Sequence, residues 1–207
     1  MKKVFIATLL VLSTVTFTIA QLRIGLSGAY SIPSNSNYKG GIAVGVQIGY
    51  IIIDNLSVEF GGMTYKYTVD GSREGLSKGS LSLVPFEFTL QGRLPLSEKK
   101  IIPYIMVGFG YEKNKFSIDS QVTAPWNNAG ISIEEKVENS MTYHTGIGVD
   151  FFLIKKLFAN MNVKYLMAET EGSWKQTDTG TGASLSGSLN NLKFGATLIS
   201  LGLKYSF

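Results

Sequence analysis

The chain ends in "LISLGLKYSF" (residues 198–207), and the last nine of these residues alternate strictly between two kinds of side chain. One set is apolar: Ile199, Leu201, Leu203, Tyr205 and Phe207. The other set is small or polar: Ser200, Gly202, Lys204 and Ser206. Because successive side chains of a β-strand point to opposite faces, the pattern predicts a strand with one apolar face. The question that this strand raises is what its apolar face contacts.

Seven earlier segments show the same alternation, over 22–31, 41–50, 82–91, 103–112, 141–153 and 157–167 and from residue 56 onward. The eighth strand is expected to begin near Asn191. Short connections at 53–55, 94–100 and 154–156 alternate with longer polar ones at 32–39, 70–79, 117–139 and 171–190. Such alternation predicts an up-and-down meander with all its short turns at one end. Closing the sheet into a barrel removes its two unpaired edges.

The face opposite the apolar one consists mostly of Gly, Ala, Ser, Thr, Asn and Gln. Small residues fit the crowded interior of an eight-stranded barrel. The exterior of a soluble barrel, such as a lipocalin, would carry many more charges than a chain with 16% charged residues offers. We therefore predict an all-β protein, an eight-stranded antiparallel up-and-down transmembrane β-barrel whose apolar face contacts hydrocarbon. The residues predicted to line its lumen are Arg23, Glu59, Glu87, His144, Asp150, Lys164 and Lys204.

Aromatic residues on the outward register gather at both ends of the predicted strands. Those at the long-loop ends are Tyr30, Tyr111, Tyr143 and Tyr165, and those at the short-turn ends are Tyr50, Phe151, Tyr205 and Phe207. Two aromatic girdles around an apolar band are typical of barrels that span a membrane.

The first twenty residues, "MKKVFIATLLVLSTVTFTIA", are typical of a secretory signal. Two lysines precede an apolar core, and Thr18-Ile19-Ala20 offers a small-residue cleavage site before Gln21. An uncleaved membrane anchor is the alternative, but polar residues dilute its second half. We expect residues 1–20 to be a signal peptide and residues 21–207 to form the barrel. The expected location is the bacterial outer membrane, with short turns and mature termini periplasmic and long loops extracellular.

Composition argues against several other classes of protein. There is no Cys, and no cluster of Lys and Arg exceeds two residues, so disulfides and nucleic-acid binding are not expected. His144 is the single histidine, and its neighbours in phase, Thr142 and Gly146, supply no serine–acid pair for nucleophilic catalysis. The loop acids Asp119, Glu134, Glu135 and Asp178 lack calcium-loop spacing. No enzyme activity, catalytic residue, cofactor or metal site is therefore predicted.

Several segments together resemble the OmpW-like group of small outer-membrane β-barrels. They are "SLVPFEFTLQG", "IIPYIMVGFGYE", "TGIGVDFFLIKKLFANMNVKYL" and the terminal "LGLKYSF", within roughly the last 125 residues. The first three strands resemble outer-membrane barrels more generally, including the OmpA and OmpX types. The resemblance implies an eight-stranded Gram-negative barrel that admits small hydrophobic molecules through a narrow, apolar lumen. Lumenal tryptophan is a feature of the group, yet neither Trp126 nor Trp174 falls in a predicted strand.

The carboxyl end adds an expected partner. A terminal strand that closes on Phe207 resembles the signature by which the barrel-assembly machinery recognises its clients. The other expected partners are the lipid bilayer, lipopolysaccharide and small hydrophobic solutes, and the protein is expected to be a monomer.

Two functions follow from the predicted lumen. The alternation slips after Gly61-Gly62, and apolar residues then fall on the inner register: Met63, Tyr65, Tyr67, Leu81, Leu83, Leu166, Phe194, Ala196 and Leu198. Without a bulge to re-aim them, the upper lumen is apolar, which favours a narrow channel for small hydrophobic solutes. The alternative is a non-conducting structural or adhesive barrel, with a lumen plugged by paired charges and with loops that bind partners.

Overall fold

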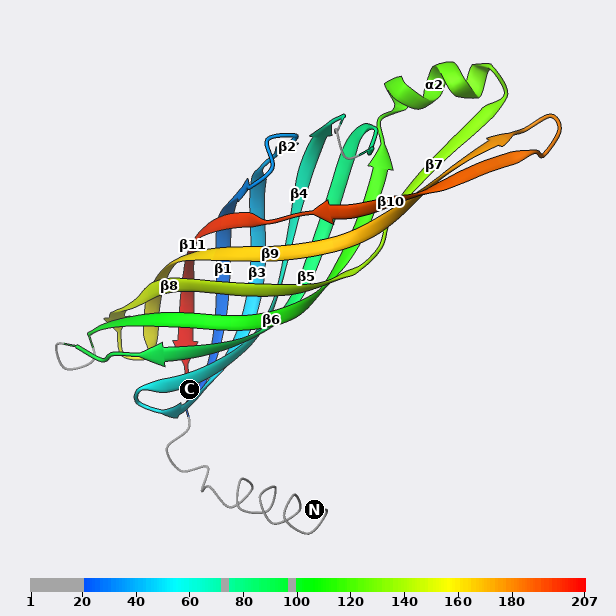
Figure 1. Cartoon of the computed structure of the whole chain (residues 1–207). Coiled ribbons are helices and arrows are strands. Elements are labelled where there is room, and N and C mark those ends of the chain that lie inside the picture. Colours follow the sequence, from blue (N-terminus) through cyan, green and yellow to red (C-terminus); the bar gives the residue numbers. More distant parts are fainter. Residues whose placement is uncertain (1–20, 72–74, 97–99) are drawn as a thin grey trace, which may run out of the picture.

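The computed structural model describes residues 21–71, 75–96 and 100–207, and its barrel is shown in Figure 1. Eight antiparallel strands form the wall: β1 (Gln21–Pro33), β3 (Gly41–Ile53), β4 (Leu56–Asp70), β5 (Lys78–Arg93), β6 (Ile101–Ile118), β8 (Ser140–Ile154), β9 (Leu157–Asp178) and β11 (Ala196–Ser206). Neighbours in sequence pair with each other, and β11 closes the barrel against β1. The predicted fold class is confirmed.

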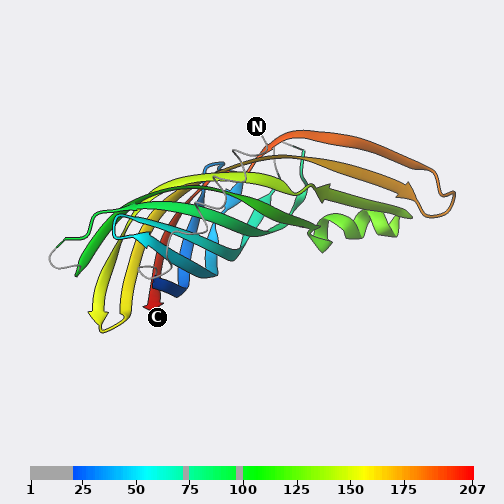
Figure 2. The ribbon, with the colours of Figure 1, turned by 90° about the horizontal axis from the view of Figure 1, so that it is seen from below.

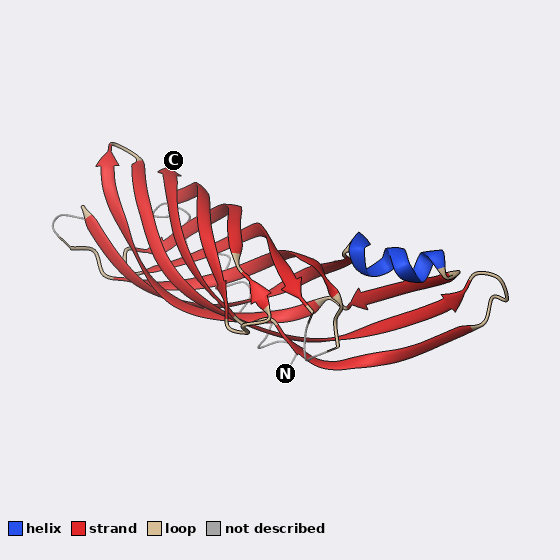
Figure 3. Cartoon of the chain, turned by 90° about the horizontal axis from the view of Figure 1, so that it is seen from above, coloured by secondary structure: helices blue, strands red, loops and turns tan. Residues whose placement is uncertain are grey.

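Four further elements lie beyond the wall: β2 (Tyr38–Lys39), α2 (Ser120–Asn128), β7 (Ile131–Val137) and β10 (Ser184–Lys193). Strand β9 continues past the barrel, and β7 and β10 pair with its two edges there. The three strands project as one extension, with α2 beside β7 (Figures 2 and 3). We call this part the β7–β9–β10 extension.

The extension corrects two sequence predictions. Residues 117–139 and 171–190 were expected to be loops, but much of each segment is strand or helix. Their Ser-, Thr- and Gly-rich composition hides the alternation, and pairing on both edges of β9 supplies the backbone hydrogen bonds that a lone hairpin lacks. Trp174 consequently lies in β9, so the prediction that neither tryptophan sits in a strand was wrong.

The turn between β9 and β10 is held by one side chain. Asp178 accepts hydrogen bonds from the backbone N–H groups of Gly180 (2.8 Å) and Thr181 (3.0 Å). These bonds favour the ionised carboxylate and lower the pKa of Asp178. Gly182 follows with φ +74°, a conformation that glycine adopts without steric cost.

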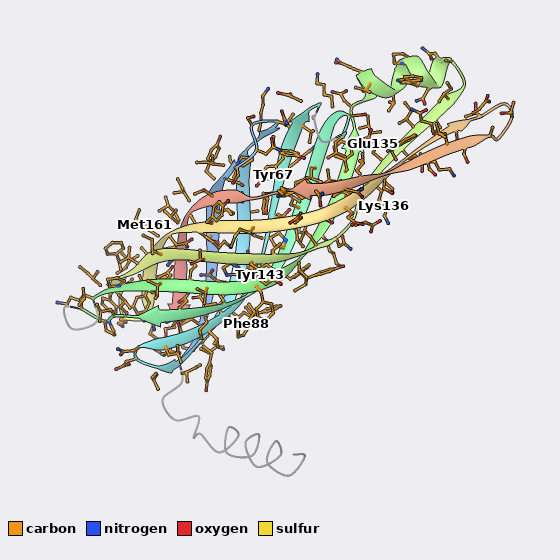
Figure 4. All side chains as sticks on the ribbon, in the orientation of Figure 1. Tyr67, Phe88, Glu135, Lys136, Tyr143 and Met161 are labelled. Atoms are coloured by element: carbon orange, nitrogen blue, oxygen red, sulfur yellow. The ribbon has the colours of Figure 1, made fainter. Side chains whose placement is uncertain are left out.

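Burial follows the predicted two faces of each strand. The apolar set is exposed: Ile42 is 78% exposed and Leu26 63%. Phe88, Tyr143 and Met161, labelled in Figure 4, belong to the same outer face. The predicted girdle residues also lie on it, with Tyr50 and Phe151 half-buried and the other six exposed. The polar set lies inside, which is the reverse of a soluble barrel.

The slip in alternation at Gly61-Gly62 is a change of composition and not a bulge. Strand β4 keeps one register with β3 and with β5 through this region. Register shifts occur instead next to two short turns, between Ile51 and Ile53 and between Phe152 and Ile154, and within β10 between Leu189 and Leu192. The inner face of β4 therefore becomes apolar toward the long-loop end.

The predicted signal peptide, residues 1–20, lies outside the described residues. Across the described parts of the chain, no helix is long and apolar enough to cross a bilayer.

Candidate functional site

The lower lumen, toward the short turns, contains a network of buried charges centred on Asp150. Its Oδ2 accepts from Nη1 of Arg23 at 2.9 Å and from Nη2 of Arg93 at 3.4 Å. Its Oδ1 accepts from Asn160 Nδ2 at 2.7 Å and lies 3.6 Å from Nζ of Lys204. Asp150 is fully buried, so this one carboxylate balances cations from three other strands.

Lys204 and Arg23 have further partners that satisfy their charges. Lys204 Nζ donates to Glu59 Oε1 at 2.6 Å and lies 5.3 Å from the centre of the Tyr104 ring. The Arg23 guanidinium lies 4.4 Å from the centre of the Phe158 ring. Cation–π contacts of this kind stabilise a desolvated cation.

A second ion pair crosses the middle of the lumen. Lys164 Nζ on β9 donates to Glu87 Oε2 on β5 at 2.5 Å. Beside this pair, His144 Nε2 lies at hydrogen-bond distance, 2.9 Å, from Thr89 Oγ1. Together with the Asp150 network, this pair forms what we call the ionic layer: Arg23, Glu59, Glu87, Arg93, Asp150, Lys164 and Lys204.

Above the ionic layer the lumen becomes apolar. Glu112 marks the boundary, where its Oε2 accepts from the Tyr65 hydroxyl at 2.8 Å. Farther toward the long loops lies a packed cluster that we call the apolar cap: Tyr65, Tyr67, Leu81, Leu83, Leu166, Phe194 and Leu198. Each of these side chains is at most 3% exposed. The cap continues under the β7–β9–β10 extension through Leu189, Leu192 and Trp174.

All seven residues predicted to line the lumen lie on the inner face, and six of them belong to the ionic layer. His144 is buried beside the Glu87–Lys164 pair. Sequence reasoning missed Arg93 and Glu112, both of which are buried and in phase with predicted inner residues. Arg93 was missed because the segment was ended at residue 91. Glu112 directly follows Tyr111, which points outward, so the alternation of the strand already indicated that Glu112 lies on the inner face.

A small cavity of about 50 Å³ lies in the middle of the lumen, among side chains of the ionic layer. Its lining includes Glu59, Glu87 and Lys164 on the polar side and Met63 and Met106 on the apolar side. This space is sufficient for ordered water and far smaller than a drug-sized ligand site.

Beside this cavity the ladder between β4 and β5 is interrupted. Their ladder pairs Gly62 with Phe86 and Tyr65 with Leu83, but Met63 and Thr64 have no paired partner on β5. Pro85 lies opposite this gap and has no N–H to donate. Gly62 and Met63 line both the inner cavity and a larger apolar groove on the outer surface.

Potential metal ligands are not clustered among the described side chains. Within residues 21–71, 75–96 and 100–207, no three His, Asp or Glu side chains are grouped so as to hold a metal ion. His144 lies between the Thr89 hydroxyl, 2.9 Å from its Nε2, and the Glu87 carboxylate, 3.9 Å from its Nδ1. Glu87 is paired with Lys164 and all three side chains of the row are buried, so the Thr89 hydroxyl is not presented to a substrate. The geometry of the lumen is that of a filled barrel, with the β4–β5 ladder interrupted at Met63 and Thr64.

Known proteins are similar to this chain in sequence and in architecture. The model of the OmpW family matches residues 10–207. Outer membrane protein W of Vibrio cholerae is 27% identical over 146 residues, which cover 68% of this chain and 64%, just under two thirds, of that protein.

Two solved structures have the same barrel fold. OprG from Pseudomonas aeruginosa superposes with a TM-score of 0.63 at 16% identity, over 91% of this chain and 96% of that one. The solution structure of Escherichia coli outer membrane protein W gives 0.54 at 19% identity, over 93% and 100%. Since the family match extends over all eight strands and the lumen described above, this chain belongs to the OmpW family of outer-membrane β-barrels.

Proposed function

We propose that this barrel admits small apolar molecules at its long-loop end and releases them sideways into the membrane, between β4 and β5. The observation that carries the proposal is the division of the lumen into an apolar cap above and an ionic layer below. The proposal takes the long-loop end as the extracellular one.

The apolar cap suits an apolar guest. Leu81, Leu83, Leu166 and Leu198 are fully buried, so a guest among them exchanges one apolar contact for another. Because these side chains fill the space, entry requires them to move, and the resting barrel is closed.

The ionic layer opposes passage to the short-turn end. An apolar molecule moving down the lumen would have to separate Lys164 from Glu87 and then Arg23 from Asp150. Separating buried partners leaves uncompensated charges, which is strongly unfavourable. An exit through the side wall avoids this cost.

The seam beside Pro85 supplies that exit. The unpaired Met63 and Thr64 on β4 weaken the wall, and Gly62 contributes no side chain to it. Outside the seam lies the apolar groove, of about 1190 Å³, which opens to the membrane.

A reversible cross-link tests the exit. The register on both sides of the seam places Thr64 across from Val84, and the chain has no native cysteine. We expect the Thr64→Cys/Val84→Cys variant, when oxidised, to take up an apolar fluorescent probe no faster than protein-free vesicles with a lipopolysaccharide outer leaflet. Reduction should restore the rate of the parent protein.

A matched pair elsewhere controls for the cross-link itself. Val107→Cys/Thr145→Cys joins β6 and β8 at directly opposed positions of an intact ladder. Its oxidation should leave uptake unchanged. Parent protein that never exceeds protein-free vesicles for any apolar probe would reject conduction altogether.

A non-conducting structural or adhesive barrel is the second candidate, favoured by the tight packing of the lumen. Under this hypothesis the β7–β9–β10 extension is the binding surface, and it exposes Leu185 (65%) while α2 exposes Trp126 (43%). A parent protein without uptake, but whose adhesion to a surface is lost on truncation of residues 179–183, would favour it.

The carboxyl terminus is proposed to be the signal for assembly. In the barrel, the Phe207 N–H donates to Leu22 O at 2.9 Å, and its ring packs edge-on against Tyr205 with centroids 5.2 Å apart. Its side chain is 57% exposed, so its deletion removes few contacts of the folded state. We expect deletion of Phe207 to reduce the amount of barrel inserted in cells sharply, as measured by heat-modifiable mobility in membrane fractions. Refolding of the same variant into detergent should be nearly normal; equal defects in both assays would contradict a recognition role.

A further inference from the structure

We propose that the outer face of β4, β5 and β6 at the long-loop end binds a phosphorylated membrane lipid. Lys66, Lys113 and Lys115 hold its phosphate groups, and the apolar groove beside Gly62 holds an acyl chain. In an outer membrane the lipid of this chemistry is lipopolysaccharide, through its phosphorylated lipid A moiety.

Strand register brings the three lysines together. Lys66 on β4 stands opposite Ser82 on β5, and Ser82 stands opposite Lys115 on β6. Adjacent strands lie about 4.8 Å apart, so the backbones of Lys66 and Lys115 are separated by about 10 Å, with the Ser82 hydroxyl between them. Lys113 lies two residues along β6, opposite Val84. Because the lysine stems are long and flexible, all three ammonium groups can reach one phosphate above Ser82.

The face changes from cationic to apolar in the direction of the membrane core. Lys113 Nζ lies 5.7 Å from the centre of the Phe86 ring, which stands opposite Gly62 and Tyr111. One step farther, Phe88 and Phe109 face each other with ring centroids 5.7 Å apart. This order, ammonium groups and then aromatic rings, matches a lipid that carries phosphate above its acyl chains.

The groove begins directly below the lysines. Its lining includes Thr64 and Val84, which share the row of Lys113, and then Gly62, Phe86 and Val46. Its volume of about 1190 Å³ exceeds that of a typical small-ligand pocket, and an extended acyl chain is an apolar occupant of suitable shape. The missing side chain at Gly62 keeps it open.

The charge of the face also selects an anion. In the described part of the chain, no carboxylate lies within ion-pair distance of Lys66, Lys113 or Lys115. The nearby Asp70 is engaged by Lys39 at 2.6 Å. Glu138, next to Asn114 on β6, is engaged by Lys136 at 2.7 Å. The exposed acids Glu134, Glu169 and Glu171 lie on β7 and β9. Among the described side chains, the three lysines are therefore a cationic patch without carboxylate partners.

The test measures lipid A binding to the detergent-purified barrel by native mass spectrometry. Each lysine near a membrane surface contributes about fivefold to the binding of anionic lipid. We therefore expect Lys66→Gln/Lys113→Gln/Lys115→Gln to weaken the binding of diphosphorylated lipid A by about a hundredfold. Dephosphorylated lipid A with the same acyl chains should bind the parent and the variant equally weakly, and inorganic phosphate should bind neither.

A matched control removes the same charge elsewhere. Lys136, Lys175 and Lys193 are exposed on the β7–β9–β10 extension, and changing all three to Gln should leave lipid A affinity unchanged. A loss as large as that of the first triple would overturn the proposal, because it would reflect net charge alone. Unchanged affinity in the first triple would do the same.

A separate variant tests the acyl groove without altering charge. A Cβ at Gly62 would meet only ordinary contacts, the nearest being Pro85 O at 3.6 Å, so Gly62→Leu is compatible with folding. It should fill the groove and weaken lipid A binding while the salt dependence of that binding is retained. Undiminished binding, in a variant with parent-like heat-modifiable mobility, would remove the groove from the site.

Discussion

Asp150→Ala is expected to lower the free energy of unfolding of the barrel by about 3–5 kcal/mol, the usual cost of breaking a buried ion pair by removing one partner. Asp150 is fully buried and accepts from Arg23, Arg93 and Asn160. Without it, Glu59 is left as the one carboxylate of the Asp150 network beside two guanidinium groups and Lys204. The measurement is equilibrium unfolding in urea with lipid vesicles, followed by circular dichroism.

An exposed ion pair provides the matched control. Asp70 lies 2.6 Å from Lys39, but the side chains are 43% and 68% exposed. Asp70→Ala should therefore change the free energy of unfolding by about 0–1 kcal/mol. If Asp150→Ala costs no more than Asp70→Ala, the Asp150 network does not hold the lower barrel together.

The barrel itself could be predicted from the sequence because its signal is short-range. Alternation in a strand depends on the geometry of consecutive residues, and in "GIAVGVQIGY" (41–50) it survives into the structure without a shift. The inner residues Arg23, Glu87 and Lys164 could be identified for the same reason, because every second residue of a strand lies on the same face of the sheet.

What the sequence left open depends on contacts between distant residues. Alternation along each strand places Arg23 and Asp150 inside the barrel. It does not predict their contact, because that contact depends on how far neighbouring strands are staggered around the barrel. The extension was missed for a related reason. Its strands carry Ser, Thr and Gly and are ordered by pairing with each other, so no apolar face marks them in advance.

The apolar cap could be interpreted only by combining the sequence pattern with the register of the strands. Tyr65 and Tyr67 break the pattern of an outward apolar face, and from sequence alone a bulge would explain them equally well. The continuous register of β4 decides the matter, since both rings then point inward. A composition change within one register is therefore the signal that distinguishes an apolar lumen from a re-aimed strand.

Lys164→Glu should have the second large effect, on both stability and conductance. In the parent protein the Lys164 ammonium group lies 2.5 Å from the Glu87 carboxylate. The substitution replaces this ammonium group with a second carboxylate. Two unpaired buried carboxylates should cost at least the roughly 3–5 kcal/mol of a broken pair. They should also draw water and cations into the middle of the lumen. Planar-bilayer recording should therefore detect a cation-selective current that the parent barrel lacks.

Charge exchange separates this electrostatic effect from a packing defect. In Glu87→Lys/Lys164→Glu the two charges trade strands, so the ion pair can form again in reverse. We expect the double variant to regain most of the lost stability and to be electrically silent, although His144 then faces a cation. Should Lys164→Glu fail to assemble, Lys164→Met tests the same pair through the unpaired Glu87 alone and should give a smaller current of the same selectivity. A double variant as unstable and as leaky as the single one would mean that shape, and not the pairing of charge, closes the middle of the barrel.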